Sequence, residues 1–100
     1  MKSLISGLNK AFDNKVRLGI MSVLLTKNES DFNGLKSILE VTDGNLASHL
    51  KALEKENYIS VMKQFIDRKP NTRYLVTDEG KSAFKKHINA LEELISNQKG

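Results

Sequence analysis

The chain contains 100 residues, of which 39% are hydrophobic, so we expect one domain over residues 1–100 with no room for a second core. Cysteine is absent, which excludes a disulfide framework, thiolate metal sites and cysteine nucleophiles. The 16 Lys and Arg outnumber the 12 Asp and Glu, and the resulting net charge of +4 gives a mild preference for polyanionic partners.

The sequence carries no sign of a membrane segment. Its apolar stretches are far below the roughly 20 residues that span a bilayer, and its first residues lack the apolar core of a secretory signal. We therefore expect a soluble, cytoplasmic protein with no membrane partner.

Two helices are predicted before residue 28. Residues 3–12 place apolar side chains at helical spacing, which predicts a short amphipathic helix. Asp13 and Asn14 can cap a second helix over residues 15–27. This second segment is the most apolar of the chain, so we expect it to form the central helix of the core.

Two further helices are predicted after a polar break at residues 28–31. Asp31 precedes a short helix over residues 32–39, whose inward side chains are predicted to be Phe32, Leu35, Ile38 and Leu39. Residues 41–44 turn the chain into a helix over residues 45–57. The inward stripe of that helix is Leu46, Leu50 and Leu53.

A β-hairpin and a long helix complete the predicted elements. Residues 59–66 are rich in β-branched and aromatic side chains, and residues 73–76 are again strand-like. The loop between them, residues 67–72, contains the only proline. Thr77, followed by two acidic residues, starts a helix over residues 77–97.

This order of elements predicts a mainly α fold with a small β-hairpin, in the α+β class. It is the order of a winged helix-turn-helix with extra helices at the N- and C-terminal ends. Residues 32–57 would form the helix-turn-helix and residues 59–76 the wing. The helix over residues 45–57 would then be the one offered to the major groove of DNA, which accepts one helix.

Side chains that suit DNA contact lie on this helix and on the hairpin. Short polar groups near the start of a recognition helix can read base edges, whereas cations bind phosphates. The candidate base contacts are Asn45, Ser48 and His49. The candidate phosphate contacts are Lys51, Lys55, Lys63, Arg68, Lys69 and Arg73, the last three being expected around the hairpin tip.

Residues 16–84, about two thirds of the chain, resemble the winged-helix regulators related to the MarR and ArsR groups, especially the short stand-alone variety. The resemblance rests on Val16-Arg17-Leu18, Ile20-Met21, Thr42-Asp43-Gly44-Asn45-Leu46, Ser48-His49-Leu50, Leu53-Glu54, Tyr58-Ile59, Phe65, Arg68-Lys69-Pro70, Thr72, Tyr74, Thr77, Glu79-Gly80 and Phe84. It implies that the helix with the Asn-Leu-x-Ser-His-Leu pattern enters the major groove. It also implies that Arg68 and Lys69 contact the flanking backbone or minor groove.

Each candidate also has a purely structural interpretation. His49 could cover the edge of the core, and Ser48 could bond the backbone within its own helix. Lys51 and Lys55 could form an ordinary solvated face. A cationic hairpin tip is harder to explain structurally, because a turn needs no cations. His87 is expected to have no function, and two isolated histidines predict no metal site.

Other function classes fit the sequence less well. The glycines are scattered, and no catalytic set of side chains is evident, so we predict neither an enzyme nor a cofactor. A winged helix can also serve as a protein-protein interaction module, but that role does not require cations at these positions. RNA is disfavoured because its deep, narrow major groove does not admit a helix. A small-molecule effector is neither indicated nor excluded.

The terminal helices, residues 1–12 and 77–97, are predicted to form a homodimer. The predicted interface is Leu4, Ile5, Leu8, Phe84, Ile88, Leu91, Leu94 and Ile95. The alternative is that the N-terminal helix folds back on the C-terminal helix of the same chain. A two-fold dimer would read an inverted-repeat operator, with half-sites about 10 to 10.5 base pairs apart or a multiple of that.

Overall fold

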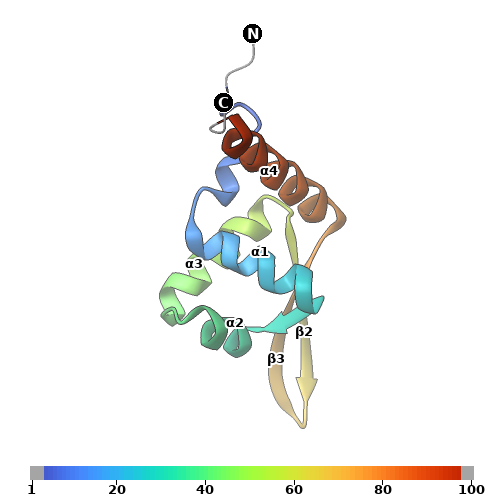
Figure 1. Cartoon of the computed structure of the whole chain (residues 1–100). Coiled ribbons are helices and arrows are strands. Elements are labelled where there is room, and N and C mark those ends of the chain that lie inside the picture. Colours follow the sequence, from blue (N-terminus) through green and yellow to red (C-terminus); the bar gives the residue numbers. More distant parts are fainter. Residues whose placement is uncertain (1–3, 98–100) are drawn as a thin grey trace.

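A computed structural model describes residues 4–97, in which helices pack on a small sheet and a hairpin projects from one end (Figure 1). The elements in chain order are η1 (Lys10–Phe12), α1 (Lys15–Lys27), β1 (Glu29–Asp31), α2 (Phe32–Leu39), α3 (Asp43–Lys55), β2 (Ile59–Ile66), β3 (Lys69–Val76) and α4 (Asp78–Asn97). The predicted α+β winged helix is confirmed.

The helix starts follow from capping side chains. The side chains of Asn14, Asp31 and Thr77 accept hydrogen bonds of 2.8 to 3.2 Å from backbone N–H groups in the first turns of α1, α2 and α4, as their positions predicted. Helix α3 begins two residues before its predicted start, because Thr42 Oγ1 accepts from the Asn45 N–H at 3.2 Å.

The sheet has three strands in the order β1-β3-β2, all antiparallel. The prediction of a simple polar break at residues 28–31 was wrong, since Glu29, Ser30 and Asp31 pair with Leu75, Tyr74 and Arg73 of β3. A strand of three residues shows no periodic pattern, and it forms here because β3 offers it an open edge.

The hairpin is tighter than predicted. Strands β2 and β3 pair without interruption from Ile59–Val76 to Ile66–Lys69, so the expected loop over residues 67–72 shrinks to two residues. Asp67 and Arg68 make this turn with positive φ values of 51° and 66°, the geometry of a type I′ hairpin. The hairpin is therefore a rigid arm rather than a ribbon with a loose tip.

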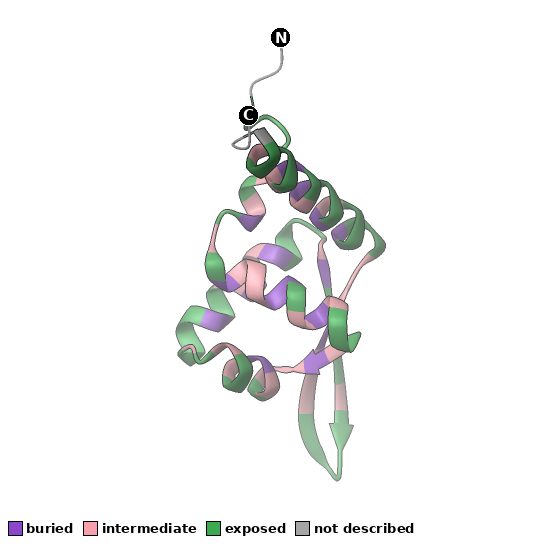
Figure 2. Ribbon diagram, in the orientation of Figure 1, coloured by how far each residue is buried: buried purple, intermediate pink, exposed green. Residues whose placement is uncertain are grey.

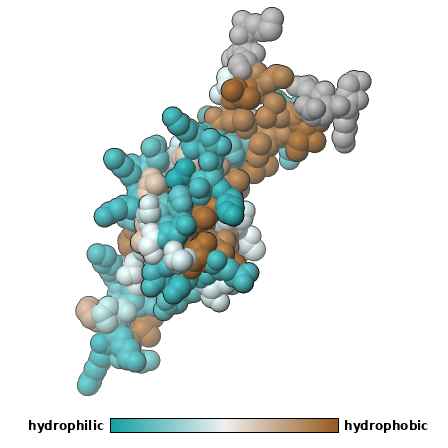
Figure 3. Space-filling model, turned by 90° about the vertical axis from the view of Figure 1, so that its left-hand side faces the viewer, coloured by the Kyte–Doolittle hydropathy of each residue, from teal (hydrophilic) through white to brown (hydrophobic). Residues whose placement is uncertain are grey.

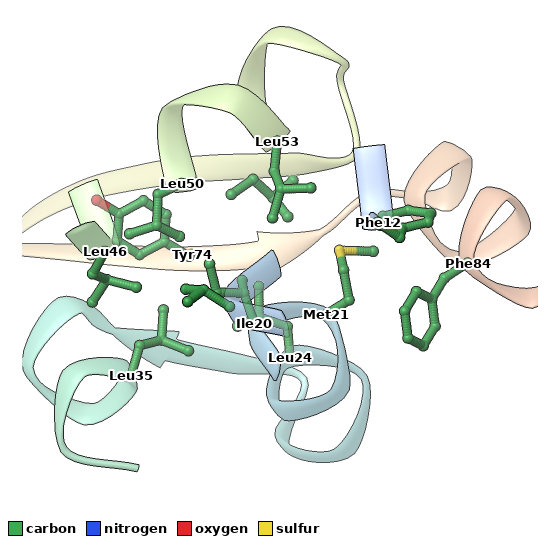
Figure 4. Close-up of a cluster of buried hydrophobic side chains, with 12 residues drawn as sticks. Phe12, Ile20, Met21, Leu24, Leu35, Leu46, Leu50, Leu53, Tyr74 and Phe84 are labelled. Carbon is green, nitrogen blue, oxygen red and sulfur yellow. The ribbon is translucent and has the colours of Figure 1, made fainter. Parts of the chain in front are cut away.

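The core lies between α1, α3, the sheet and the start of α4 (Figure 4). Its largest fully buried side chains are Phe12, Ile20, Met21, Leu24, Leu35, Leu46, Leu50 and Leu53. The predicted inward stripe of α3 is thus confirmed. Ile38 was wrongly predicted to face inward: it is 46% exposed, because the short helix α2 turns mainly Leu35 into the core.

The N-terminal segment is not the amphipathic helix that was predicted. Residues 4–7 form a turn, and only Lys10–Phe12 are helical, as a single 3-10 turn. Asn9 is the physical reason, since its side chain accepts the Ala11 N–H at 2.9 Å and so competes with helical hydrogen bonding.

This segment folds against α4 of its own chain, as the intrachain alternative stated. The Asn9 N–H donates to His87 Nδ1 at 2.9 Å, and the Phe12 ring packs edge-on to that of Phe84 at 5.2 Å between centroids. Phe84 is 8% exposed, so its assignment to a dimer interface was wrong. His87 is 5% exposed, and it holds the N-terminal segment in place.

Candidate nucleic-acid interface

Helix α3 presents a polar face to solvent opposite its buried leucines (Figure 2). The exposed residues of α3 include Asn45, Ser48, Lys51 and Lys55, which were predicted as DNA contacts, and also Asp43, Gly44, Ala47 and Glu54. Because the leucine stripe anchors one side of the helix in the core, the opposite side has a fixed orientation.

Helices α2 and α3 form the predicted helix-turn-helix. The turn between them is short, and the Lys36 Nζ atom lies 2.8 Å from Asp43 Oδ1 across it. Both partners of this ion pair are exposed, so its contribution to stability is small. The packing of Leu35 and Leu46 in one core fixes the angle between the two helices.

His49 differs from the other candidates on α3 because it is half-buried. Its Nδ1 atom lies 3.1 Å from Nη1 of Arg17 on α1. Partial burial, and secondly the charge of Arg17, lower the pKa of His49 below the ordinary 6.5. The neutral imidazole therefore predominates at pH 7, with one ring nitrogen as hydrogen-bond donor and the other as acceptor.

The wing carries cations and apolar side chains together. Lys63, Arg68 and Lys69 are exposed, as predicted for phosphate contacts. Beside them, Phe65 is 75% exposed and Ile66 45% exposed on β2. An exposed phenylalanine forgoes the stabilisation that burial would give, so the tip is suited to contact a surface that is both anionic and partly apolar.

Arg73 does not belong to the hairpin tip, contrary to the prediction. It lies in the middle of the sheet, paired in register with Asp31 of β1 and Met62 of β2. Its Nε atom donates to Glu29 Oε1 at 2.5 Å, and its side chain is only 26% exposed. The charge of Arg73 is thus neutralised within the protein, where it joins β1 to β3.

Arg17 is a site residue that the sequence reasoning did not single out. It lies on the core side of α1, at helical spacing with the buried Met21 and Leu24, and it is half-buried. That spacing was a usable signal, because a guanidinium on a buried stripe needs hydrogen-bond partners. It finds them in the Ala11 carbonyl, at 2.6 Å, and in His49.

The opposite end of the molecule is apolar (Figure 3). Leu4, Ile5 and Ile95 are 65%, 63% and 60% exposed there. The other residues predicted at a dimer interface are half-buried: Leu8, Ile88, Leu91 and Leu94. Exposed hydrophobic side chains thus lie at both ends of a particle with extents of 57 × 25 × 21 Å, beside the chain termini and on the wing.

Within residues 4–97, no three His, Cys, Asp or Glu side chains gather so as to hold a metal ion. None of the described helices is long and apolar enough to cross a membrane.

A helix-turn-helix whose second helix exposes short polar side chains and two lysines, followed by a cationic β-hairpin, is the arrangement found in winged-helix DNA-binding regulators. This class is not an enzyme class. The chain belongs to the winged helix DNA-binding domain family, which matches residues 16–95.

The chain is similar over most of its length to one archaeal sequence and to one archaeal protein of solved structure. The chain is 36% identical over 88 residues to an uncharacterized protein of Methanocaldococcus jannaschii, covering 88% of this chain and 96% of that protein. It is 32% identical to a transcriptional regulator homologue of Pyrococcus horikoshii OT3, with a TM-score of 0.85 over 95% of this chain and 92% of that one.

The predicted resemblance to MarR-type regulators is also confirmed at the level of the fold. A MarR-like transcriptional regulator of Thermotoga maritima superposes with a TM-score of 0.65, over 94% of this chain and 69% of that one. The two sequences are 19% identical, so this likeness concerns the fold alone.

Proposed function

We propose that the protein is a cytoplasmic transcriptional regulator that binds duplex DNA sequence-specifically as a homodimer. In this proposal α3 enters the major groove, and the wing contacts the flanking backbone or minor groove. The observation that carries it is the exposed face of α3, which combines short polar side chains with lysines and is anchored from behind by buried leucines.

The proposed contacts divide by chemistry. Asn45, Ser48 and His49 lie within the first two turns of α3, where short side chains reach base edges. The proposed phosphate contacts are the exposed cations Lys51, Lys55, Lys63, Arg68 and Lys69. Arg73 is left out because it is paired with Glu29.

Selection of bound duplexes from a random library tests this function. Enrichment of an inverted repeat, with half-sites separated by about one helical turn of 10 to 10.5 base pairs or a multiple of it, is the expected result. Failure to enrich any duplex, together with equal binding of wild type and an Asn45→Ala variant to random DNA, would leave the protein-interaction alternative as the better one.

The homodimer is supported by the apolar end of the molecule. The 20 residues of α4 make a helix about 30 Å long at 1.5 Å per residue. Its C-terminal half and the N-terminal turn leave Leu4, Ile5 and Ile95 more than half exposed. A two-fold copy placed here would cover these side chains, and the wings at the far end would stay free.

Ile95→Glu tests the dimer without disturbing the protomer, because Ile95 is 60% exposed in it. A charge in an apolar seam is strongly unfavourable, so we expect a folded monomer by light scattering and much weaker binding to a full operator. The matched control is Asn89→Glu, which adds the same charge on an exposed polar position of α4. A wild-type protein that is monomeric at tens of micromolar and binds half-sites as tightly as full operators contradicts the proposal.

A further inference from the structure

We propose that His49 contacts DNA as a neutral hydrogen-bond donor through Nε2, and that Arg17 is the positioning residue that aims it. The partner on DNA is then a hydrogen-bond acceptor, either a purine N7 or O6 at a base edge or a phosphate oxygen. This inference rests on the proposed function, since it assigns a specific role within the same interface.

The roles of the two ring nitrogens follow from the partner of the first. A guanidinium carries five N–H donors and no acceptor. Arg17 Nη1 lies 3.1 Å from His49 Nδ1, so Nδ1 is the acceptor of this hydrogen bond. In a neutral imidazole the proton is then on Nε2, which is left as the only polar ring atom available to a ligand.

Arg17 is itself held from a second side. Its Nε donates to the Ala11 carbonyl at 2.6 Å, which fixes the plane of the guanidinium. Its backbone N–H is bound by the capping Asn14 at 3.2 Å, which fixes the start of α1. A half-buried arginine with these contacts is a rigid support for the His49 ring rather than a mobile surface cation.

The position of His49 on α3 places this donor beside the side of the helix that is proposed to face the groove. His49 follows the exposed Ser48 and precedes Leu50, which is 1% exposed, so the ring lies at the border between the core and the groove-facing side. Acceptors in the major groove are purine N7, guanine O6 and thymine O4, whereas the amino groups of adenine and cytosine are donors. An Nε2–H group therefore selects among base edges by hydrogen-bond polarity.

The ring can be examined first in the free protein. Long-range ¹H–¹⁵N NMR spectra at pH 7 should show an unprotonated Nδ1 and a protonated Nε2 for His49. In Arg17→Met the pKa of His49 should rise toward its ordinary value, because the guanidinium charge is gone. A wild-type His49 protonated at Nδ1 overturns the proposal, whether or not the protein binds DNA.

The contact is then tested by pairing protein variants with modified duplexes that carry the selected sequence. Replacing purines one at a time by 7-deazapurines removes N7, replacing guanine by 2-aminopurine removes O6, and methylphosphonate linkages remove phosphate acceptors. One substitution should weaken wild-type binding about two- to ten-fold, the loss expected for a single neutral hydrogen bond. If the substitution that weakens binding is a modified purine, the acceptor is a base atom. If it is a methylphosphonate linkage, the acceptor is a phosphate oxygen.

Two substitutions at residue 49 separate the proposed roles of the ring nitrogens. His49→Gln can place an amide N–H near the position of Nε2 and should retain the effect of the modified position. His49→Asn is too short to do so and should lose that effect. Arg17→Met should also lose it. Arg17→Lys can still donate to Nδ1 and should retain part of the effect.

Two outcomes refute the inference and are distinct from failure of the proposed function. Either the protein binds its operator and no modified position depends on residue 49, or Arg17→Met retains the full wild-type effect. If wild type binds no duplex at all, the proposed function itself is wrong.

Discussion

Replacing both Arg68 and Lys69 by alanine should weaken DNA binding by a salt-dependent amount that can be calculated. Each phosphate contact adds about 0.9 to the slope of log affinity against log salt concentration. Five proposed cations per protomer give ten per dimer and a slope near −9, and the double variant removes four of the ten contacts and about 3.6 of that slope. Between about 50 and 200 mM salt, the affinity of the variant should therefore fall about 150-fold less than that of wild type.

The control for this experiment is Lys85→Ala with Lys86→Ala. These two exposed lysines of α4 carry the same charge, but they lie on the helix at the opposite end from the wing (Figure 1). Fluorescence anisotropy titrations at four or more salt concentrations should give a wild-type slope for the α4 pair and a flatter slope for the wing pair. Equal slopes for both pairs would mean that net charge, and not the wing, determines binding.

Three further predictions follow from particular contacts. Phe65→Ser should weaken DNA binding without changing the salt slope, since it removes apolar contact but no charge, and the same titrations measure it. Gly80→Ala should lower the free energy of unfolding, measured by urea denaturation, by about 1–3 kcal/mol, because its Cβ would lie 2.1 Å from the Tyr58 carbonyl oxygen. Gly44→Ala would place its Cβ near no other atom, so it should instead raise the free energy of unfolding by up to about 1 kcal/mol. His49 has a lowered pKa, so the unfolded chain binds its proton at higher pH than the folded protein; stability should fall as pH drops below 6.5, and less steeply in His49→Gln.

The parts of the fold that the sequence predicted are those with a local cause. The stripe of Leu46, Leu50 and Leu53 has helical spacing, and the capping side chains Asp31 and Thr77 act within a turn of their own position. The exposed residues of α3 follow directly, because they are what the leucine stripe leaves outside. The exposure of Asn45, Ser48, Lys51 and Lys55 could therefore be predicted from the sequence.

The errors arose where a distant partner decides the structure. Strand β1 forms because β3 lies beside it, although β3 is distant in the sequence. Glu29 of β1 and Arg73 of β3, whose side chains are hydrogen-bonded, are 44 residues apart. Likewise, the apolar spacing of residues 3–12 is compatible with a helix, but Asn9 finds partners in His87 and in the Tyr58 hydroxyl at 3.0 Å. Neither contact has a signature in the local sequence, so charge clustering placed Arg73 at the tip and periodicity made the N-terminus helical.

The same long-range contacts connect the N-terminal segment to α4 and, through Arg17, to α3. On one side, Asn9 and Phe12 contact α4 through His87 and Phe84. On the other, the Ala11 carbonyl accepts a hydrogen bond from Arg17, whose guanidinium in turn contacts His49 on α3. The orientation of His49 therefore depends on a segment that is packed against the helix of the proposed dimer interface, and not on α3 alone.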